Sequence, residues 1–547
     1  MSVDIYPIAL ATAVTIARVL VLIALSIVTG WVLGYIAIKS RWFENVWITL
    51  VNVFESIPVI AFFPLVLVVF INGLGGTWGV ELASDFLVFD AVVWNVWIGI
   101  YQAFKTVPGD LLEVAENYDF GFLRRMADLY IPHSIPRITT NMFSSFADAM
   151  FYITVSEVFS VGITTYKSFG IGSVLVAFLR AGNLTGVYYS LLCIAVGVVC
   201  VTLVFSRTNR WAVSKFGTNT DIVIRRRTGP LQAYIQREEQ YLVRELKTVR
   251  HMIHKVRAPP SVPLSNPYER QHLLTKQEVK YIEFAGTIVA IAVLTYVLYS
   301  VYLIAASVSA QQWARFLSIT PFLVYAMAVD YLRVAAITIL SFILAVTVGY
   351  YLARHHRISV PVTTAVQIIA AFPAPAYFPL IFIATLPFME NLLPLTYAEV
   401  YIFMLGFLSC FYYVFFDFWT GVQGIPAEFW ELMRNYRLST YTRIRYIILP
   451  GTLPYLITGL SSTINSAWAG IAIGEFWPNI YGTQTLQTGI GMMRFISLNM
   501  ANGDVADAAW VSLIFGLVIV VYSIFFTRNL MDLARKKFVV EEGIYAA

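Results

Sequence analysis

The chain has 547 residues, of which 59% are apolar and only 13% are charged, and its mean hydropathy is +0.71. Soluble domains contain about 45–50% apolar and about 25% charged residues, so the composition excludes an ordinary soluble fold. The net charge of +5 is small for this length, and the positions of the charges are more informative than their sum.

Apolar runs of about 20 residues, the length that a helix needs to cross a bilayer, recur from end to end. They predict an all-α polytopic membrane protein with about 11 transmembrane helices, whereas the short alternating strands of a membrane barrel are absent from the sequence. No Lys or Arg precedes Arg18, so the first run is predicted to be a retained helix and not a secretory signal. The predicted spans lie near residues 10–37, 52–72, 88–106, 137–160, 186–206, 281–305, 330–353, 364–386, 398–420, 455–475 and 507–527.

The positions of the basic residues predict the orientation of these spans. With the N-terminus outside and the C-terminus in the cytoplasm, nearly all of the 37 Lys and Arg residues fall on the cytoplasmic side, as the positive-inside rule requires. We therefore expect a multi-pass protein of the cell (cytoplasmic) membrane in this orientation. The exceptions are Lys167, Arg180, Arg315 and Arg494, which would lie outside, and Arg18 and Arg333, which would lie within helices.

The two halves of the chain carry the same residues in the same order, which predicts an internal duplication. The offset between matched residues is constant within helices and changes by a few residues only at loops. Matched pairs include Arg18 and Arg333, Gly34 and Gly349, Pro58 and Pro373, Glu113 and Glu431, Pro132 and Pro450, Glu157 and Glu475, and Gly170-Ile171-Gly172 and Gly489-Ile490-Gly491.

Each copy is predicted to hold five spans that start outside and end inside, so one additional helix must return the chain between them. Tyr281–Ala305 supplies this helix and has no counterpart in the first half. The two copies should then lie in parallel, related by an axis along the membrane normal, with a substrate path along that axis. The predicted divisions are a first repeat at 1–206, a basic cytoplasmic linker at 207–280, a connecting helix with an external segment at 281–329, a second repeat at 330–530 and a cytoplasmic tail at 531–547.

The linker is rich in Lys and Arg and contains the run Arg225-Arg226-Arg227. One interpretation is a cytoplasmic tether that is attracted to anionic lipid headgroups. The alternative is a regulatory element or one that contacts a partner protein. His251 and His254 lie one helical turn apart within it, but two histidines alone are a weak indication of a metal site.

No catalytic, cofactor or metal site is predicted. Cys193, Cys200 and Cys410 all lie in apolar runs, where they act as small apolar side chains. The sequence contains no G-x4-G-K-[S/T] phosphate-binding loop, no H-E-x-x-H zinc motif and no G-x-S-x-G nucleophile turn. The chain is therefore predicted not to be an enzyme, and purified alone it should not hydrolyse ATP.

Each half contains one cytoplasmic loop of the same design. The first runs from Pro108 through Glu113 to Pro132, and the second runs from Pro426 through Glu431 to Pro450. A proline near the start and a second proline as a stop predict a short helix in each loop. Such a helix offers apolar and charged side chains to a soluble partner.

These loops resemble those of permease subunits of binding-protein-dependent ABC importers, particularly the nitrate/sulfonate/taurine type. That family carries a loop of pattern E-A-A-x3-G-x9-I-x-L-P whose helix docks into a cleft of the ATP-hydrolysing subunit. The segments Ile57-Pro58 to Pro64-Leu65 and Leu449–Tyr455, and Trp468, also fit the family. The resemblance covers roughly 10–206 and 330–530 and implies these docking residues: Glu113, Ala115, Asn117, Asp119, Pro132, Glu431, Met433, Asn435, Arg437 and Pro450.

The loops depart from the family pattern at its glycine, which is Asp119 in one copy and Arg437 in the other. Glycine would relax the turn after the docking helix. The opposite charges lead to the hypothesis that the two loops contact their ATPase subunits differently, whereas the alternative is that both side chains are only solvated.

A charge at bilayer depth costs at least about 2.5–3.5 kcal/mol, so it should be paired or face a pathway. Asp148 lies midway along its span, opposite Ser466 in the repeat, and Glu157 and Glu475 lie near the outer ends of matched spans. One interpretation is that these acids form structural pairs, for which Arg18 or Arg333 would suffice. The other is that Asp148, Glu157, Glu475 and Trp468 line or gate the path.

The resemblance implies the permease component of an ATP-driven ABC importer that translocates a small solute, such as nitrate or a sulfonate. It further implies two copies of a separate ABC ATPase subunit, one external solute-binding protein, and one copy of this chain in the complex, with no nucleic acid. An anion would be repelled by acids in a pore, and a weakly selective pore would reduce this conflict. The alternative function is a secondary active transporter with parallel repeats.

Overall fold

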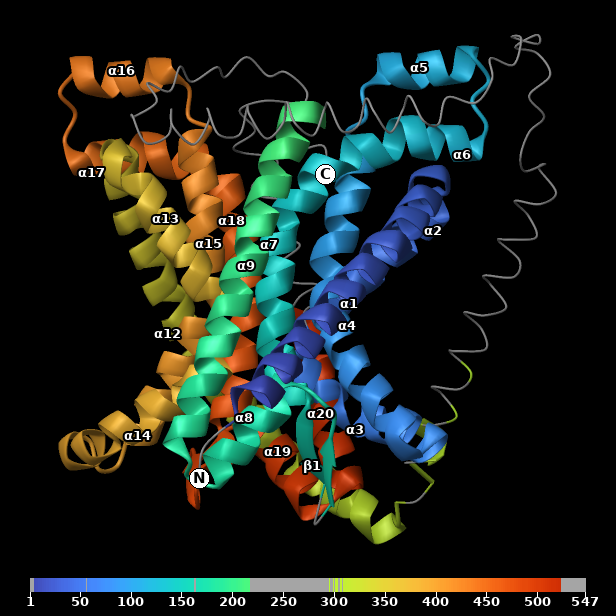
Figure 1. The fold of residues 1–547 in the computed structure, drawn as a ribbon, viewed down its shortest axis with the longest axis vertical. Coiled ribbons are helices and arrows are strands. Elements are labelled where there is room, and N and C mark those ends of the chain that lie inside the picture. Colours follow the sequence, from blue (N-terminus) through green and yellow to red (C-terminus); the bar gives the residue numbers. More distant parts are fainter. Residues whose placement is uncertain are drawn as a thin grey trace.

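In a computed structural model, the chain forms a helical bundle whose two halves are built from equivalent elements (Figure 1). The structure describes residues 4–55, 57–161, 164–216 and 308–522, together with residues 295, 299, 301–303, 305 and 306. Most of the predicted linker, most of the connecting helix Tyr281–Ala305, the pair His251 and His254, and the cytoplasmic tail lie outside the described residues.

The first half contains fourteen described elements in chain order. They are α1 (Ile5–Lys39), α2 (Arg41–Glu55), η1 (Val59–Phe62), α3 (Phe63–Val66), η2 (Leu67–Asn72), α4 (Gly76–Lys105), α5 (Gly109–Asn117), α6 (Phe122–Arg125), η3 (Met126–Tyr130), α7 (Ile131–Ser156), β1 (Val158–Val161), β2 (Thr164–Lys167), α8 (Ile171–Arg180) and α9 (Leu184–Phe216).

The second half repeats this order nearly element by element, down to a π-helical turn before the fourth long helix. Its elements are α12 (Ala310–Arg354), α13 (His356–Ala371), α14 (Ala374–Leu392), α15 (Tyr397–Gln423), α16 (Ala427–Asn435), α17 (Thr440–Arg443), η5 (Ile444–Ile448), α18 (Leu449–Gly474), β3 (Phe476–Tyr481), β4 (Gln484–Gln487), α19 (Met492–Asn502) and α20 (Val505–Tyr522). We call the two halves the first and second copies.

The two copies lie in parallel, as the sequence predicts. In Figure 1, α5 and α16 lie at one end of the molecule, and the start of α1 lies at the opposite end. Within the described residues, seven helices are long and apolar enough to cross a membrane, and the bent pair α13 and α14 would be an eighth. A membrane-spanning fold is thus confirmed, whereas the predicted total of about 11 spans is not.

The second predicted span of each copy is broken, contrary to the expectation of continuous helices at 52–72 and 364–386. Helix α2 ends at Glu55 and the helical turn η1 begins only at Val59, and α13 and α14 meet at an angle of 91°. Pro58 and Pro373 lie at the two breaks. A proline lacks a backbone donor and disfavours helix at the residue before it, so a straight helix cannot pass through.

Helix α12 starts twenty residues earlier than predicted, so much of the expected external segment at 281–329 is helical. Ser309 caps α12: its hydroxyl accepts from the Gln312 amide at 3.2 Å, and the Gln312 side chain accepts from the Ser309 amide at 2.9 Å. This reciprocal pair satisfies donors that a helix start leaves free. Pro321 lies inside α12 without ending it.

The copies are joined by elements that cross between them. Helices α13 and α14 pack on α7, and η1 and α3 pack on α20. At the end away from α5 and α16, β3 packs on α8 and β1 packs on α19. The backbone amide of Gly482 donates to the Leu179 carbonyl at 2.9 Å, and the Tyr481 hydroxyl donates to the Gly182 carbonyl at 3.0 Å. Each copy therefore supplies part of the other's packing.

Candidate functional site

A cavity opens between the two copies at the middle of the long helices, and we call it the central cavity. The first copy contributes residues of α2, η1, α4 and α7, and the second contributes residues of α15 and α18. Its polar lining is Glu55, Asp90, Asn95 and Asp148 from the first copy and Tyr413, Ser462, Asn465 and Ser466 from the second.

The three acids of this cavity all belong to the first copy. The duplication matches Glu55 with Ala370, Asp90 with Leu408 and Asp148 with Ser466, none of which carries a charge. The second copy folds into the same helices without these acids, so the fold itself does not require them. This asymmetry distinguishes the cavity from the rest of the duplicated architecture.

Asp148 lies where the two copies meet. One carboxylate oxygen accepts a short hydrogen bond from the Tyr413 hydroxyl of the second copy, and the other accepts from the Asn95 amide of the first at 3.4 Å. Asn95 and Tyr413 occupy equivalent positions in α4 and α15. Asp148 is thus held by matched donors from both copies, next to Ser466, its own counterpart.

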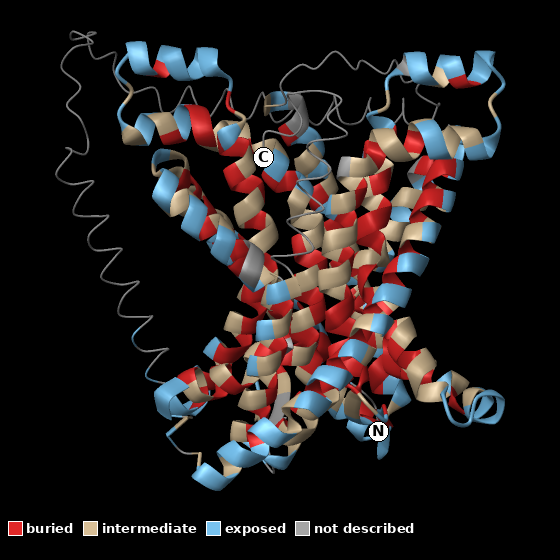
Figure 2. Cartoon of the chain, turned by 180° about the vertical axis from the view of Figure 1, so that it is seen from behind, coloured by how far each residue is buried: buried red, intermediate tan, exposed pale blue. Residues whose placement is uncertain are grey.

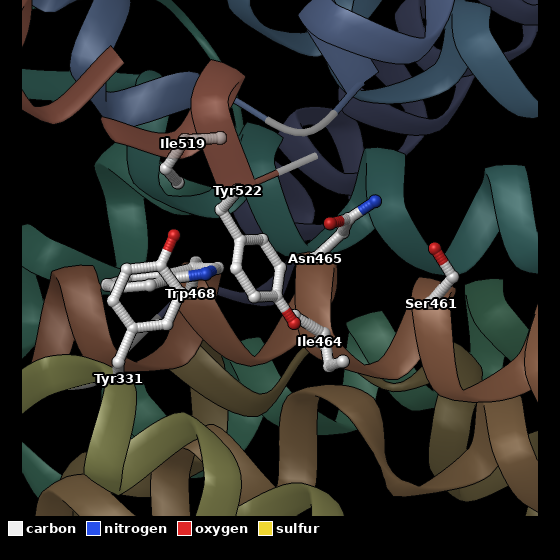
Figure 3. Close-up of a pocket in the computed structure, with 7 residues that line it drawn as sticks. All are labelled: Tyr331, Ser461, Ile464, Asn465, Trp468, Ile519 and Tyr522. Atoms are coloured by element: carbon white, nitrogen blue, oxygen red, sulfur yellow. The ribbon is translucent and has the colours of Figure 1, made fainter. Parts of the chain in front are cut away.

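Trp468 lies beside the central cavity in a separate small pocket (Figure 3). Its ring is fully buried and packs edge-on against Tyr331 at 5.1 Å and against Phe515 at 5.2 Å between centroids. Asn465 lines both this pocket and the central cavity. The predicted pathway residue Trp468 therefore shares the neighbour Asn465 with the central cavity, and its role in a path stays a prediction.

Arg18 forms the centre of a charged network in the first copy. Its guanidinium pairs with Glu81 in a short contact, with Asp85 at 3.4 Å and with Glu157 at 4.0 Å. It also donates to the Ser168 hydroxyl at 2.5 Å. Because four helical or loop segments contribute these groups, the network connects the helices towards the end away from α5 and α16.

Arg333 forms the matching network in the second copy. It donates to both oxygens of Glu399 at 2.7 and 2.8 Å, to Asp330 at 2.6 Å and to Glu475 at 2.8 Å. Glu399 occupies the position equivalent to Glu81. Its two hydrogen bonds form the bidentate geometry in which arginine binds a carboxylate most strongly.

The networks differ at one acid. Thr15 in α1 donates to Glu157 at 2.6 Å. The second copy has an acid, Asp330 of α12, at the position equivalent to Thr15, and Asp330 accepts from the Met492 amide at 2.7 Å. The first copy has Asp85 where the second has Phe403. Each arginine therefore faces three acids, although the third acid comes from a different helix in each copy.

Glu157 and Glu475 lie inside these networks and not on the central cavity. Both are fully buried, and each packs against the glycine that precedes a short helix, Gly170 before α8 and Gly491 before α19. A Cβ at either glycine would overlap the carboxylate. The structure thus matches Gly170 with Gly491, so the match of the two Gly-Ile-Gly segments is wrong by two residues.

The predicted docking helices are present as α5 and α16, and they project from one end of the molecule (Figure 2). Every residue of α5 is exposed except Ala115, which is buried against the membrane helices. Met433 occupies the equivalent buried position in α16. Ala115 and Met433 therefore anchor the helices, and the exposed side chains, including Glu113 and Glu431, are the ones free to meet a partner.

The prolines that close the two motifs do not stop the docking helices, contrary to expectation. Pro132 and Pro450 lie in the first turn of α7 and α18, each directly after the π-helical turn η3 or η5. The helices end well before these prolines, at Asn117 and Asn435, and two residues later Asp119 and Arg437 turn the chain with φ angles of 51° and 46°. The left-handed turn that glycine provides in the family pattern is thus retained without glycine.

The exposed faces of the two helices differ in charge. Helix α5 and its turn carry Asp110, Glu113, Glu116 and Asp119, whereas the equivalent residues are Glu428, Glu431, Arg434 and Arg437. The second half of each motif is acidic in one copy and basic in the other. A partner would meet two surfaces of equal shape and unequal charge.

Sequence reasoning missed Glu81, Glu399, Glu55 and Asp90. Glu81 and Glu399 stand at the same offset as Glu113 and Glu431, so the repeat could have indicated them. Glu55 and Asp90 lie in or beside predicted spans at 52–72 and 88–106, where any acid is a candidate for function. Asp148 is therefore one of three unduplicated acids at the cavity.

Comparison with known proteins yields one family and several distant relatives. A family model described as a binding-protein-dependent transport system inner membrane component matches the chain twice, over residues 24–217 and 341–539. Together these matches cover more than half of the chain, and each falls on one structural copy.

Individual relatives share shorter stretches. A putative aliphatic sulfonates transport permease protein of Bacillus subtilis is 28% identical over 14% of this chain and 29% of that protein. A nitrate import permease protein of Leptolyngbya laminosa is 29% identical over 20% of this chain and 37% of that protein. A bicarbonate transport system permease protein of Synechococcus elongatus is 24% identical over 26% and 48%, respectively. The aligned stretches thus span less than half of each of these relatives.

Proposed function

The chain belongs to the family of binding-protein-dependent transport system inner membrane components, and on this premise we propose that its two copies together form the permease of an ATP-driven importer. The family consists of transport components of the membrane, and the apolar helices make this chain a multi-pass membrane protein. A small solute, delivered by an external binding protein, would pass between the copies through the central cavity.

The observation that carries this proposal is the pair α5 and α16. Both helices are exposed along nearly their whole length and present apolar side chains such as Leu111, Tyr118, Phe429 and Tyr436 to solvent. Exposed apolar groups in a polar setting favour a protein partner. Two equivalent helices at one end of the molecule fit two ATPase subunits, one on each copy.

The same arrangement supports the proposed orientation. Helices α5 and α16 would lie in the cytoplasm, where the ATPase subunits are, and the start of α1 would lie outside. The domain divisions at 1–206 and 330–530 belong to this proposal, and so do the docking roles of Glu113, Asn117, Glu431 and Asn435. One chain would replace the two permease subunits of a complex with two ATPase copies and one binding protein.

Reconstitution tests the proposal directly. The full chain would be placed in liposomes with its ATPase subunits and binding protein, and ATP hydrolysis that depends on the binding protein would be measured. Leu111→Asp and Phe429→Asp should each reduce this hydrolysis at least tenfold. Leu395→Asp is the matched control, because Leu395 is 96% exposed and precedes α15 at the end away from α16.

The alternative function is a secondary transporter, and it has a distinct outcome. Uptake driven by an ion gradient without ATP, together with normal uptake by the Leu111→Asp and Phe429→Asp variants, would contradict the proposal.

A further inference from the structure

We propose that the central cavity binds a monovalent organic cation, so that the solute carried by this permease differs in charge from those named for its relatives. This inference rests on the proposed function, because it assigns the substrate class of the same path. The named solutes of the three relatives are sulfonates, nitrate and bicarbonate, which are all anions.

Three carboxyl groups converge on the cavity from three separate elements. Glu55 ends α2, Asp90 lies in the middle of α4 and Asp148 in the middle of α7. Glu55 and Asp148 are close enough to interact electrostatically, and both Asp90 and Asp148 interact with Tyr152 on the cavity wall. An anion in this space would be repelled, and a cation would be attracted.

Within the described part of the chain, the cavity lining contains no Lys, Arg or His to balance these acids. Arg18 and Arg333 are held in their own networks, and Arg137 of α7 donates to the Gln102 side chain and does not line the cavity. Asp90 is only 6% exposed, and its Oδ2 atom has no hydrogen-bond partner among the described residues. A buried carboxylate oxygen without a partner is costly, and a bound cation would compensate it.

The acids are not a by-product of the fold. Arg18, Glu81 and Glu157 recur in the second copy, as expected of groups that the architecture needs. Glu55, Asp90 and Asp148 are replaced there by Ala370, Leu408 and Ser466. Charges that only one copy keeps at a shared cavity serve the occupant of that cavity.

The other lining residues indicate an organic cation and not a metal ion. Trp94, Tyr152 and Tyr413 place aromatic rings around the acids, and aromatic faces attract ammonium and similar cations. No group of three His, Cys, Asp or Glu side chains among the described residues is arranged to hold a metal ion. Separated acids with aromatic walls suit a cation whose charge is spread over several atoms.

Three probes of similar size test this assignment on the purified full chain in nanodiscs. They are benzyltrimethylammonium, benzenesulfonate and benzyl alcohol, which share one ring and carry a positive, a negative and no charge. We expect benzyltrimethylammonium to bind at least tenfold more tightly than the other two. Asp90→Asn and Glu55→Gln should each weaken its binding at least tenfold while leaving the thermal unfolding midpoint unchanged or raised.

Asp417→Asn is the control, because Asp417 is an intramembrane acid of α15 that does not line the cavity. This variant should bind benzyltrimethylammonium as the unmodified chain does. Equal or tighter binding of benzenesulfonate or benzyl alcohol would overturn the proposal, and so would unchanged cation binding in both cavity variants. Either result would leave ATP-driven transport intact, because the proposed function fails only if hydrolysis is insensitive to α5, α16 and the binding protein.

Discussion

The two copies share their arginine networks but not their cavity acids, and this contrast separates charges that build the protein from charges that serve its cargo. Arg18 and Arg333 each face three acids, two of them at equivalent places, with Glu157 and Glu475 fully buried. In contrast, Asp90 is buried without a cation beside it, and its counterpart Leu408 is apolar. The arginine and two of its acids thus recur in both copies, whereas the acids of the central cavity come from one copy only.

Removing a network arginine should have the largest effect. Arg333→Met would leave the buried acids Asp330 and Glu475 without their cation, which should destabilise the protein by roughly 3–5 kcal/mol. Thermal unfolding of the purified chain measures this change. Arg18→Met is the comparison and should destabilise the protein less. Its acids Glu81 and Asp85 are each about a third exposed, so water can solvate them when the arginine is removed. Unchanged stability of Arg333→Met would contradict the structural role of the networks.

Replacing a cavity acid by the equivalent residue of the second copy should stabilise the protein instead of destabilising it. Asp90→Leu copies the residue of the second copy and removes a buried carboxylate whose Oδ2 atom has no hydrogen-bond partner among the described residues, so the protein should gain about 1–3 kcal/mol of stability. The same variant should lose ATP-driven transport. Glu475→Leu serves as the control and should destabilise the chain. A lower unfolding midpoint for Asp90→Leu would show that the acid is structural and would remove the contrast between the copies.

Substitutions in the turns after α5 and α16 should change the stability least. Arg437 adopts a left-handed conformation at φ 46°, which costs a long side chain about 1 kcal/mol. Arg437→Gly should therefore stabilise the turn by up to about 1 kcal/mol, and slower amide exchange in residues 427–443 would report it. Asp119→Gly should gain less, because aspartate tolerates this conformation better. Faster exchange in Arg437→Gly would contradict this explanation.

The predicted docking segments show which features a local sequence motif can predict and which it cannot. The motif around Glu113 and Glu431 predicted two short helices, and both are present as α5 and α16. The same motif did not reveal that Ala115 and Met433 face inwards, because burial depends on helices that are distant in the sequence. It also placed the end of each helix at Pro132 and Pro450, whereas the helices end earlier, just before the left-handed residues Asp119 and Arg437.

The sequence alone determined the membrane class, the duplication, the parallel copies and the charges that recur in both copies, because apolar length and repeated residues are read from the chain itself. Only the tertiary structure decided which acids meet which arginine, that Glu399 binds Arg333, and that Glu55, Asp90 and Asp148 converge on one cavity. These contacts join residues that are far apart in the chain. The free energy of these contacts depends on the distance between the charges and on the low polarity around them. Neither quantity can be read from a local sequence pattern.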